Sequence, residues 1–152
     1  MKYIKIVLIS VMLIIFSIYL PTSVMATTNN NKIIQEAEEN PGTIISIDPV
    51  QSRIASTSFH SYVNRSARIQ VDRTSTNTGI SLNITIQGNY DMDICIFARG
   101  TTTVVGYTHT AKAGQMTTMS WSASELGNTR SVDIFMTSYT NVTQYVYGAI
   151  SY

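Results

Sequence analysis

Two aspartates, Asp91 and Asp93, flank a methionine shortly after a glycine–asparagine pair. Alternate residues of an extended strand share one face and lie roughly 6–7 Å apart, so the two carboxylates project side by side. Calcium takes about six to eight oxygen ligands, and Gly88 and Asn89 offer further oxygens nearby. Two carboxylates alone do not specify a metal, and two interpretations are open: a calcium site at Asp91 and Asp93, or two charges screened by solvent or arginine. The candidate arginines are Arg65, Arg68, Arg73 and Arg99.

A catalytic centre would have to be built from Cys95, His60 and His109, since the chain has one cysteine and two histidines. Neither histidine has the spacing of a zinc ligand. Cys95 and His109 could act as nucleophile and base, but a lone cysteine in an apolar strand is more often a small buried hydrophobe. The sequence contains no Gly-x-Ser-x-Gly elbow, zinc-protease helix or phosphate-binding glycine loop. We therefore expect that the protein is not an enzyme.

Aromatic residues form the third candidate site. Trp121, Tyr107 and Tyr139 would provide a flat platform for sugar rings or for a protein partner. Sandwich cores also use one tryptophan and several tyrosines whose hydroxyl groups reach the rim, so core packing is the alternative. Tyr90, Tyr145 and Tyr147 belong to the same candidate group.

Short strands must position these residues. From Thr43 onward, turn signals such as Asp48-Pro49, Gly88-Asn89 and Gly127-Asn128 recur at roughly ten-residue spacing. Strands this short, without a helical period between them, predict an all-β fold: an antiparallel, jelly-roll-like β-sandwich over residues 43–152. The expected strands are 43–48, 53–62, 66–73, 79–87, 92–99, 102–110, 115–121, 130–139 and 144–151. One helical turn is expected at 124–126.

Alternation within the strands assigns their faces. The side chains directed into the core include Ile80, Leu82, Ile84 and Ile86. In the strands at 92–99 and 130–139 the second face also carries aromatic residues: Phe97 lies there with Asp93 and Cys95, and Phe135 with Asp133 and Tyr139. A loop that covers this face, or an outer contact surface, would explain the pattern.

The first 26 residues predict a secretory signal peptide. Lys2 and Lys5 precede the uncharged apolar run Ile6–Leu20, and small residues before position 27 place the cleavage after Ala26. The run is shorter than the roughly 20 residues that a membrane-spanning helix needs. We therefore expect a secreted, extracellular protein. Residues 27–42 are polar and end in a Pro-Gly turn, which indicates a linker or a removable leader; two helical turns at 32–39 would be marginal in isolation.

The charge balance excludes some partners. The chain has ten basic and nine acidic residues, and loss of Lys2 and Lys5 leaves eight against nine. Such a balance supplies no basic field for nucleic acid or anionic lipid. Cys95 has no second cysteine to pair with, so the fold must be stabilised by packing and hydrogen bonds.

The stretch "ISLNITIQGNYDMDICIFARG" and the later "RSVDIFMTSYTNVTQYVYGAISY" resemble the bacterial pre-peptidase C-terminal domain. The family pattern joins an alternating strand, a glycine turn, an Asp-x-Asp strand and a closing strand pair. The matching positions are Gly88, Asp91, Asp93, Ile94, Ile96, Val132, Ile134, Tyr145 and Tyr147, within residues 53–152. The resemblance implies a β-sandwich that accompanies secreted proteases, binds calcium in some members and helps bind insoluble substrate in others. Cys95 departs from the pattern, and the residues before position 53 in this sequence are too few for a protease domain.

Together these observations predict a secreted, non-catalytic binding or surface-interaction module. Its partner would be an extracellular protein or a polysaccharide surface, with calcium as an optional stabiliser. The alternative is a small secreted membrane-active toxin or bacteriocin-like protein, because the alternating stretches 79–87 and 102–110 also suit a lipid-spanning hairpin.

Overall fold

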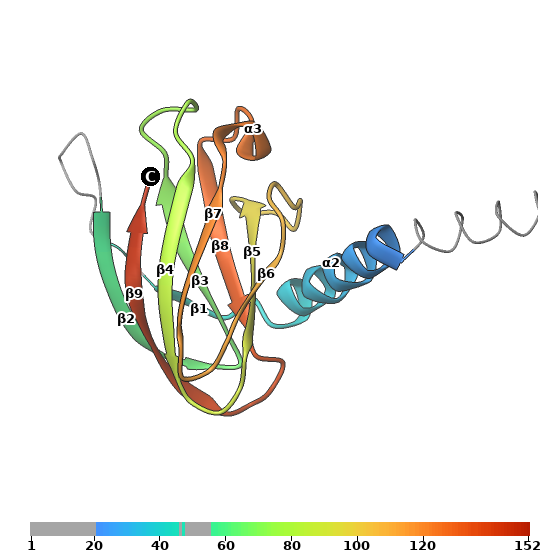
Figure 1. Ribbon diagram of the computed structural model, residues 1–152, viewed down its shortest axis with the longest axis vertical. Coiled ribbons are helices and arrows are strands. Elements are labelled where there is room, and N and C mark those ends of the chain that lie inside the picture. The colour runs from blue at the N-terminus through green and yellow to red at the C-terminus, as the bar shows by residue number, and fades with distance from the viewer. Residues whose placement is uncertain (1–20, 46, 48–55) are drawn as a thin grey trace, which may run out of the picture. The chain divides into compact units, whose positions relative to one another are not determined.

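The computed structural model describes residues 21–45, 47 and 56–152, with side chains from residue 30 onward. Nine strands in these ranges form two facing sheets (Figure 1). The strands are β1 (Thr43–Ile45), β2 (Ser56–Asn64), β3 (Ser66–Asp72), β4 (Ile80–Gln87), β5 (Met92–Ala98), β6 (His109–Ala111), β7 (Met116–Trp121), β8 (Ser131–Thr137) and β9 (Thr143–Ser151). The helices are α2 (Pro21–Glu39) and α3 (Ala123–Leu126).

The strand order is that of a jelly roll. Sheet A has the order β1-β3-β8-β5-β6, and sheet B has the order β2-β9-β4-β7. The antiparallel pairs are nested: β2 pairs with β9, β3 with β8, β4 with β7 and β5 with β6. Strand β1 adds a parallel edge beside β3. The expected all-β, jelly-roll-like sandwich is confirmed, because eight strands paired in this nested way and folded into two sheets define that architecture.

The core fills the space between the two sheets. Strand β4 alternates buried and half-buried residues, with Ile80, Leu82, Ile84 and Ile86 at most 1% exposed. Val132, Ile134 and Met136 of β8 and Met92, Ile94 and Ile96 of β5 meet them from sheet A. The predicted inward and outward faces of these strands are confirmed.

The chain divides into two compact units, residues 1–32 and 33–152. In the second unit the last turns of α2 cover the outer face of sheet A. Ile33 and Ala37 pack against Cys95, Phe97 and Phe135, all of them buried. This cover explains why the outer faces of β5 and β8 carry large apolar side chains. A helix, rather than the expected loop or contact surface, provides it.

The segment 27–42 differs from the linker that its composition indicates. The helix is longer than two turns, and tertiary contacts stabilise its C-terminal part, which would be marginal in isolation. Arg68 donates from Nε to the Pro41 carbonyl at 2.9 Å and from Nη2 to the Ala37 carbonyl at 3.0 Å. A cation at a helix C-terminus also interacts favourably with the helix dipole. Processing of this segment remains a prediction.

The predicted signal peptide lies outside the described residues up to residue 20, and its last six residues begin helix α2. Cleavage after Ala26 therefore remains a prediction. Within the described ranges, none of the helices has an apolar run long enough to cross a bilayer.

One expected strand is wrong. Residues 102–110 form only a bridge between Val104 and Phe97 before β6 begins at His109. Between that bridge and the Ile94–His109 pair, β5 has two residues and its partner segment has four. The extra residues bring the Tyr107 carbonyl to the Trp121 indole, whose Nε1 donates to it at 2.8 Å. A buried indole N–H needs an acceptor. Because the Tyr107 carbonyl serves as this acceptor, the pairing of its segment with β5 is interrupted.

A buried arginine, Arg73, connects the loops at one end of the sandwich through hydrogen bonds. Arg73 follows β3, is 3% exposed and donates to the carbonyls of Thr76, Thr78, Gly127 and Thr129. Its shortest bonds are 2.6 Å, from Nη1 to Thr129 and from Nη2 to Thr78. Desolvation lowers the pKa of this guanidinium. Helix α3 confirms the expected turn and starts with a capping box between Ser122 and Glu125.

Candidate functional site

A cluster of aromatic side chains lies on the outer face of sheet B. The register of β2 on β9 sets Tyr62 opposite Tyr145 and His60 opposite Tyr147. Because side chains alternate along a strand, all four point away from sheet A. We call these four residues the tyrosine face: His60, Tyr62, Tyr145 and Tyr147.

The rings of the tyrosine face are in mutual contact and open to solvent. The centroids of Tyr62 and Tyr145 are 5.0 Å apart, and those of Tyr145 and Tyr147 are 5.8 Å apart. The His60 ring lies 6.3 Å from Tyr145. Tyr62 is 72% exposed and Tyr147 37%. Exposed aromatic clusters of this kind commonly mark interaction surfaces.

The strands of sheet B, which carries the tyrosine face, lack the four strongly charged residue types. None of β2, β4, β7 and β9 contains Asp, Glu, Lys or Arg. Serine, threonine, asparagine and glutamine accompany the tyrosines on the outer face. A ligand at this surface would meet aromatic rings, hydroxyls and amides, and no formal charge from the strands.

The predicted aromatic platform is not assembled from the residues expected. Trp121 is 1% exposed and belongs to the core between the sheets, so its ring is not available as a platform. Tyr107 is 68% exposed but sits in the loop before β6. Tyr139 is half-buried, and its hydroxyl donates to Oδ2 of Asp93 at 3.1 Å. Burial and the Asp93 charge raise the pKa of that hydroxyl.

Tyr62 and His60 are the functional candidates that sequence reasoning missed as parts of a surface. Both lie at alternate positions of an expected strand, as do Tyr145 and Tyr147 near the end of the chain. Alternation alone could have indicated an aromatic face on each strand. The pairing of β2 with β9, more than 80 residues apart, was needed to join them into one surface.

Asp91 and Asp93 bind different partners. Asp91 accepts from Lys112 Nζ at 2.6 Å and from the Ala113 backbone N–H at 2.9 Å. The Lys112 hydrogen bond, helped by Ala113, lowers the pKa of the Asp91 carboxyl. Asp93 accepts from Thr110 Oγ1 at 2.7 Å and from Tyr139.

The expected screening of Asp91 is therefore provided by Lys112 and not by any of the four arginines named. In the described part of the chain, no three His, Cys, Asp or Glu side chains gather as a metal would require. Calcium at Asp91 and Asp93 remains a prediction, and the ion would have to compete with Lys112.

Cys95 and His109 lie on opposite faces of sheet A. Cys95 points outward under helix α2, and burial raises the pKa of its thiol to about 11. His109 pairs in register with Ile94, whose side chain faces the core, and meets the Trp121 ring edge-on at 5.0 Å between centroids. The two side chains are thus not placed to act as nucleophile and base.

An open pocket of about 540 Å³ lies at one end of sheet B. Ser81, Ser120 and Ser151 line it from the outer face, with Trp121, Glu125 and Tyr152 around them. The register places these three serines at the far end of the strands from Tyr62 and Tyr145. The pocket therefore continues the surface that the tyrosine face begins.

Comparison with known proteins leaves the family open. No family model matches the sequence, and no curated protein sequence matches it. Among solved structures, the chain is similar to PliG of Aeromonas hydrophila, a periplasmic lysozyme inhibitor of g-type lysozyme. The TM-score is 0.41 and the identity 12%, over 72% of this chain and 95% of that chain.

Proposed function

We propose that the protein is a secreted, non-catalytic binding module whose binding surface is the outer face of sheet B. The observation that carries this proposal is the tyrosine face, three exposed or half-exposed tyrosine rings in contact with one another on two paired strands. Tyrosine supplies a large, amphipathic contact area and loses little conformational entropy when it binds. The partner is an extracellular macromolecule, either a protein or a polysaccharide.

The position of the tyrosines on regular strands reduces the conformational ordering that binding requires. Tyr62 and Tyr145 stand on strands that pair along nine residues, and β9 is held on its other side by β4. Rings on such a support are oriented before the ligand arrives, so less ordering is needed at binding. The ligand surface is therefore preformed.

Sedimentation with washed cells and isolated cell envelopes tests the proposal. Fluorescently labelled exported protein should co-sediment, and the variant Tyr62→Ser/Tyr145→Ser/Tyr147→Ser should bind at least about tenfold more weakly, as expected on loss of central aromatic contacts. Tyr90→Ser/Tyr107→Ser removes two exposed tyrosines elsewhere and is the matched control. Equal sedimentation of the two variants would contradict the proposal.

The membrane-active alternative remains a hypothesis with a separate test. In this fold the apolar side of β4 packs against sheet A, and only the last two residues of the second expected stretch belong to a strand. A lipid-spanning hairpin would require both segments to leave these positions. Dye release from liposomes at micromolar protein would support the alternative, and intact vesicles would remove it.

A further inference from the structure

The outer face of sheet B consists of four rows of side chains that run across the strands. The first row contains Tyr62, Tyr145 and Gln87; the second contains His60, Tyr147, Thr85 and Met116. The third row contains Ser58, Ala149, Asn83 and Thr118, and the fourth contains Ser56, Ser151, Ser81 and Ser120. Tyr145 in the first row and Ser151 in the fourth are six positions apart in β9, a distance of roughly 20 Å along an extended strand.

The chemistry of the face changes along this length. Aromatic rings dominate the first two rows, and hydroxyl and amide groups dominate the last two. Thr118 Oγ1 donates to Oδ1 of Asn83 at 2.7 Å, which fixes the orientation of that amide in the third row. The fourth row opens into the 540 Å³ pocket, where Ser81, Ser120 and Ser151 form part of the wall.

We propose that this face binds the chain of an uncharged polysaccharide, laid along β9 from the tyrosine face to the pocket. The inference rests on the proposed function and names the class of ligand. The C–H faces of sugar rings stack on the tyrosines, whose rings present an apolar surface with a polar tip. Sugar hydroxyls exchange hydrogen bonds with the serine, threonine and amide groups, which can both donate and accept.

The absence of Asp, Glu, Lys and Arg from the four strands favours this ligand over a protein. About a quarter of the residues in an average protein are charged. A protein patch docked on sheet B would lose water from its charges and find no opposite charge on the strands, which is costly. An uncharged glycan chain carries no such cost. The same reasoning disfavours nucleic acid and acidic polysaccharides, which depend on basic side chains.

The shape of the site favours an extended chain over a single sugar. The tyrosine rings and the pocket lie at opposite ends of the strands, and the polar rows between them are exposed or half-exposed. One small molecule cannot contact both ends. A linear polymer can cover all four rows, and the pocket then receives a residue at one end of the bound stretch.

Retention on insoluble, uncharged polysaccharides tests the inference. The probes are cellulose, chitin, curdlan and granular starch, each incubated with the exported protein and its tyrosine variants. We expect retention on at least one of them, with an affinity that is unchanged up to about 1 M NaCl, where the Debye length is only about 3 Å. Tyr62→Ala/Tyr145→Ala should weaken retention at least tenfold, whereas Tyr90→Ala/Tyr107→Ala should not.

A second variant tests the charge argument without removal of a ring. Thr85→Lys places a charge in the second row, between Tyr147 and Met116. It should weaken retention on the same polysaccharide, while Thr110→Lys, at the one exposed position of β6, should have no effect. Equal melting temperatures of variants and wild type exclude unfolding as the cause.

The outcomes separate this inference from the proposed function. Failure of all four polysaccharides to retain the protein overturns the inference, and so does retention that the tyrosine variant leaves unchanged. Envelope binding that needs the tyrosines, survives periodate treatment and is abolished by proteinase would leave the proposed function standing with a protein partner. Envelope binding that does not need the tyrosines would overturn both.

Discussion

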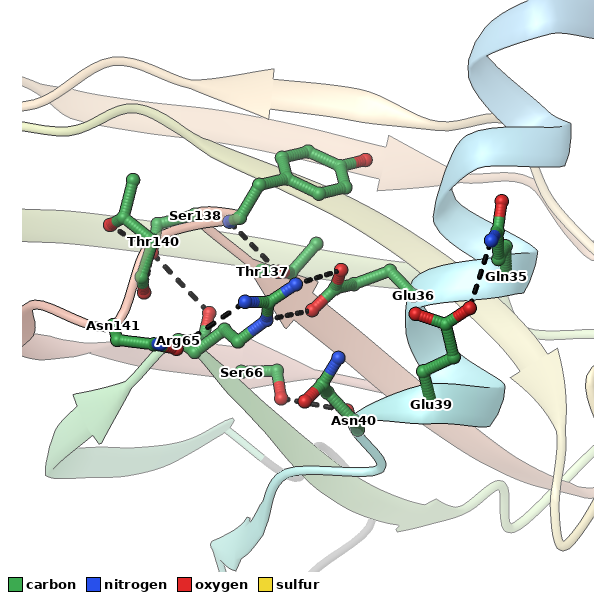
Figure 2. A network of polar contacts seen from close by, with 11 residues as sticks. Gln35, Glu36, Glu39, Asn40, Arg65, Ser66, Thr137, Ser138, Thr140 and Asn141 are labelled. Atoms are coloured by element: carbon green, nitrogen blue, oxygen red, sulfur yellow. Dashed lines mark hydrogen bonds and ion pairs between the residues drawn. The ribbon is translucent and has the colours of Figure 1, made fainter.

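Arg65 and Glu36, 29 residues apart in the chain, form a bidentate ion pair. Nε of Arg65 donates to Oε1 of Glu36 at 2.5 Å, and Nη2 donates to Oε2 at 2.8 Å (Figure 2). Arg65 is the single residue between β2 and β3, and its φ of 68° lies in the left-handed region. The turn from one sheet to the other thus also holds the helix segment that covers sheet A.

This ion pair should control the reactivity of Cys95. The thiol is buried beneath Ile33 and Ala37, so reagents reach it only when the helix end opens locally. Glu36→Gln weakens the contact and should raise the rate of Cys95 modification by dithionitrobenzoate roughly tenfold. Glu39→Gln, on the exposed side of the same turn, is the control. Equal rates in both variants would show that the pair does not hold the cover in place.

Arg73 should be a main determinant of stability. Its guanidinium donates to four loop carbonyls, and a lysine has neither the number nor the geometry of donors to replace it. Arg73→Lys should lower the free energy of unfolding by about 3 kcal/mol, since hydrogen bonds to charged groups contribute about 1.5–3 kcal/mol each. Urea denaturation measures the change. Arg130→Lys, at an exposed position, should be neutral, and similar losses in both variants would contradict this account.

His109 should make stability depend on pH. Desolvation lowers its pKa below the usual 6.5, although Glu125 acts in the opposite direction. At a pH near 6.5 the His109 side chain is therefore protonated to a greater extent in the unfolded chain than in the folded protein. The free energy of unfolding should fall as pH drops from 7 through 6.5 towards 5. His109→Phe should reduce this slope, and His60→Gln, at an exposed position, should retain it. Urea midpoints at pH 7 and pH 5 provide the comparison; identical slopes in all three proteins would refute the assignment.

Calcium should have little effect on thermal stability. Asp91 already has Lys112 and the Ala113 N–H as donors, and Asp93 has Thr110 and Tyr139. A calcium site that forms only in the folded state would raise the melting temperature by mass action. We expect equal melting temperatures in calcium and in chelator. A rise in the wild type that Asp93→Asn abolishes would establish the site instead.

Most of the fold was predictable because side-chain alternation and turn residues indicate the same strands. Strict alternation in β4 and turn residues at each strand end identify eight of the nine strands within a few residues. The exception, 102–110, depends on a distant residue: the indole N–H of Trp121 draws the Tyr107 carbonyl out of register. Gly106 accommodates this close approach, since a Cβ there would lie 2.4 Å from Cδ1 of Trp121. No local pattern reports such a contact.

The sequence predicted that the candidate surface is aromatic, but not which residues form it. An aromatic platform was expected, but Trp121 was assigned to it when the tryptophan fills the core instead. Composition cannot distinguish the two uses of a large ring. Which tyrosines meet depends on the β2–β9 register, a contact between residues far apart in the sequence. The resemblance to the pre-peptidase C-terminal domain stays a prediction, and the calcium site that it implies is the hypothesis that the melting experiment tests.

The nested pairing of strands constrains how the molecule is made. Strand β9 lies in the interior of sheet B, between β2 and β4. Neither of these two strands can complete its backbone hydrogen bonds before residues 143–151 are in place. Pairing over such sequence separations makes folding slow. A chain that completes its fold only with its last segment is compatible with the export that its first 26 residues predict. A chain shortened by those nine residues would lack the central strand of sheet B.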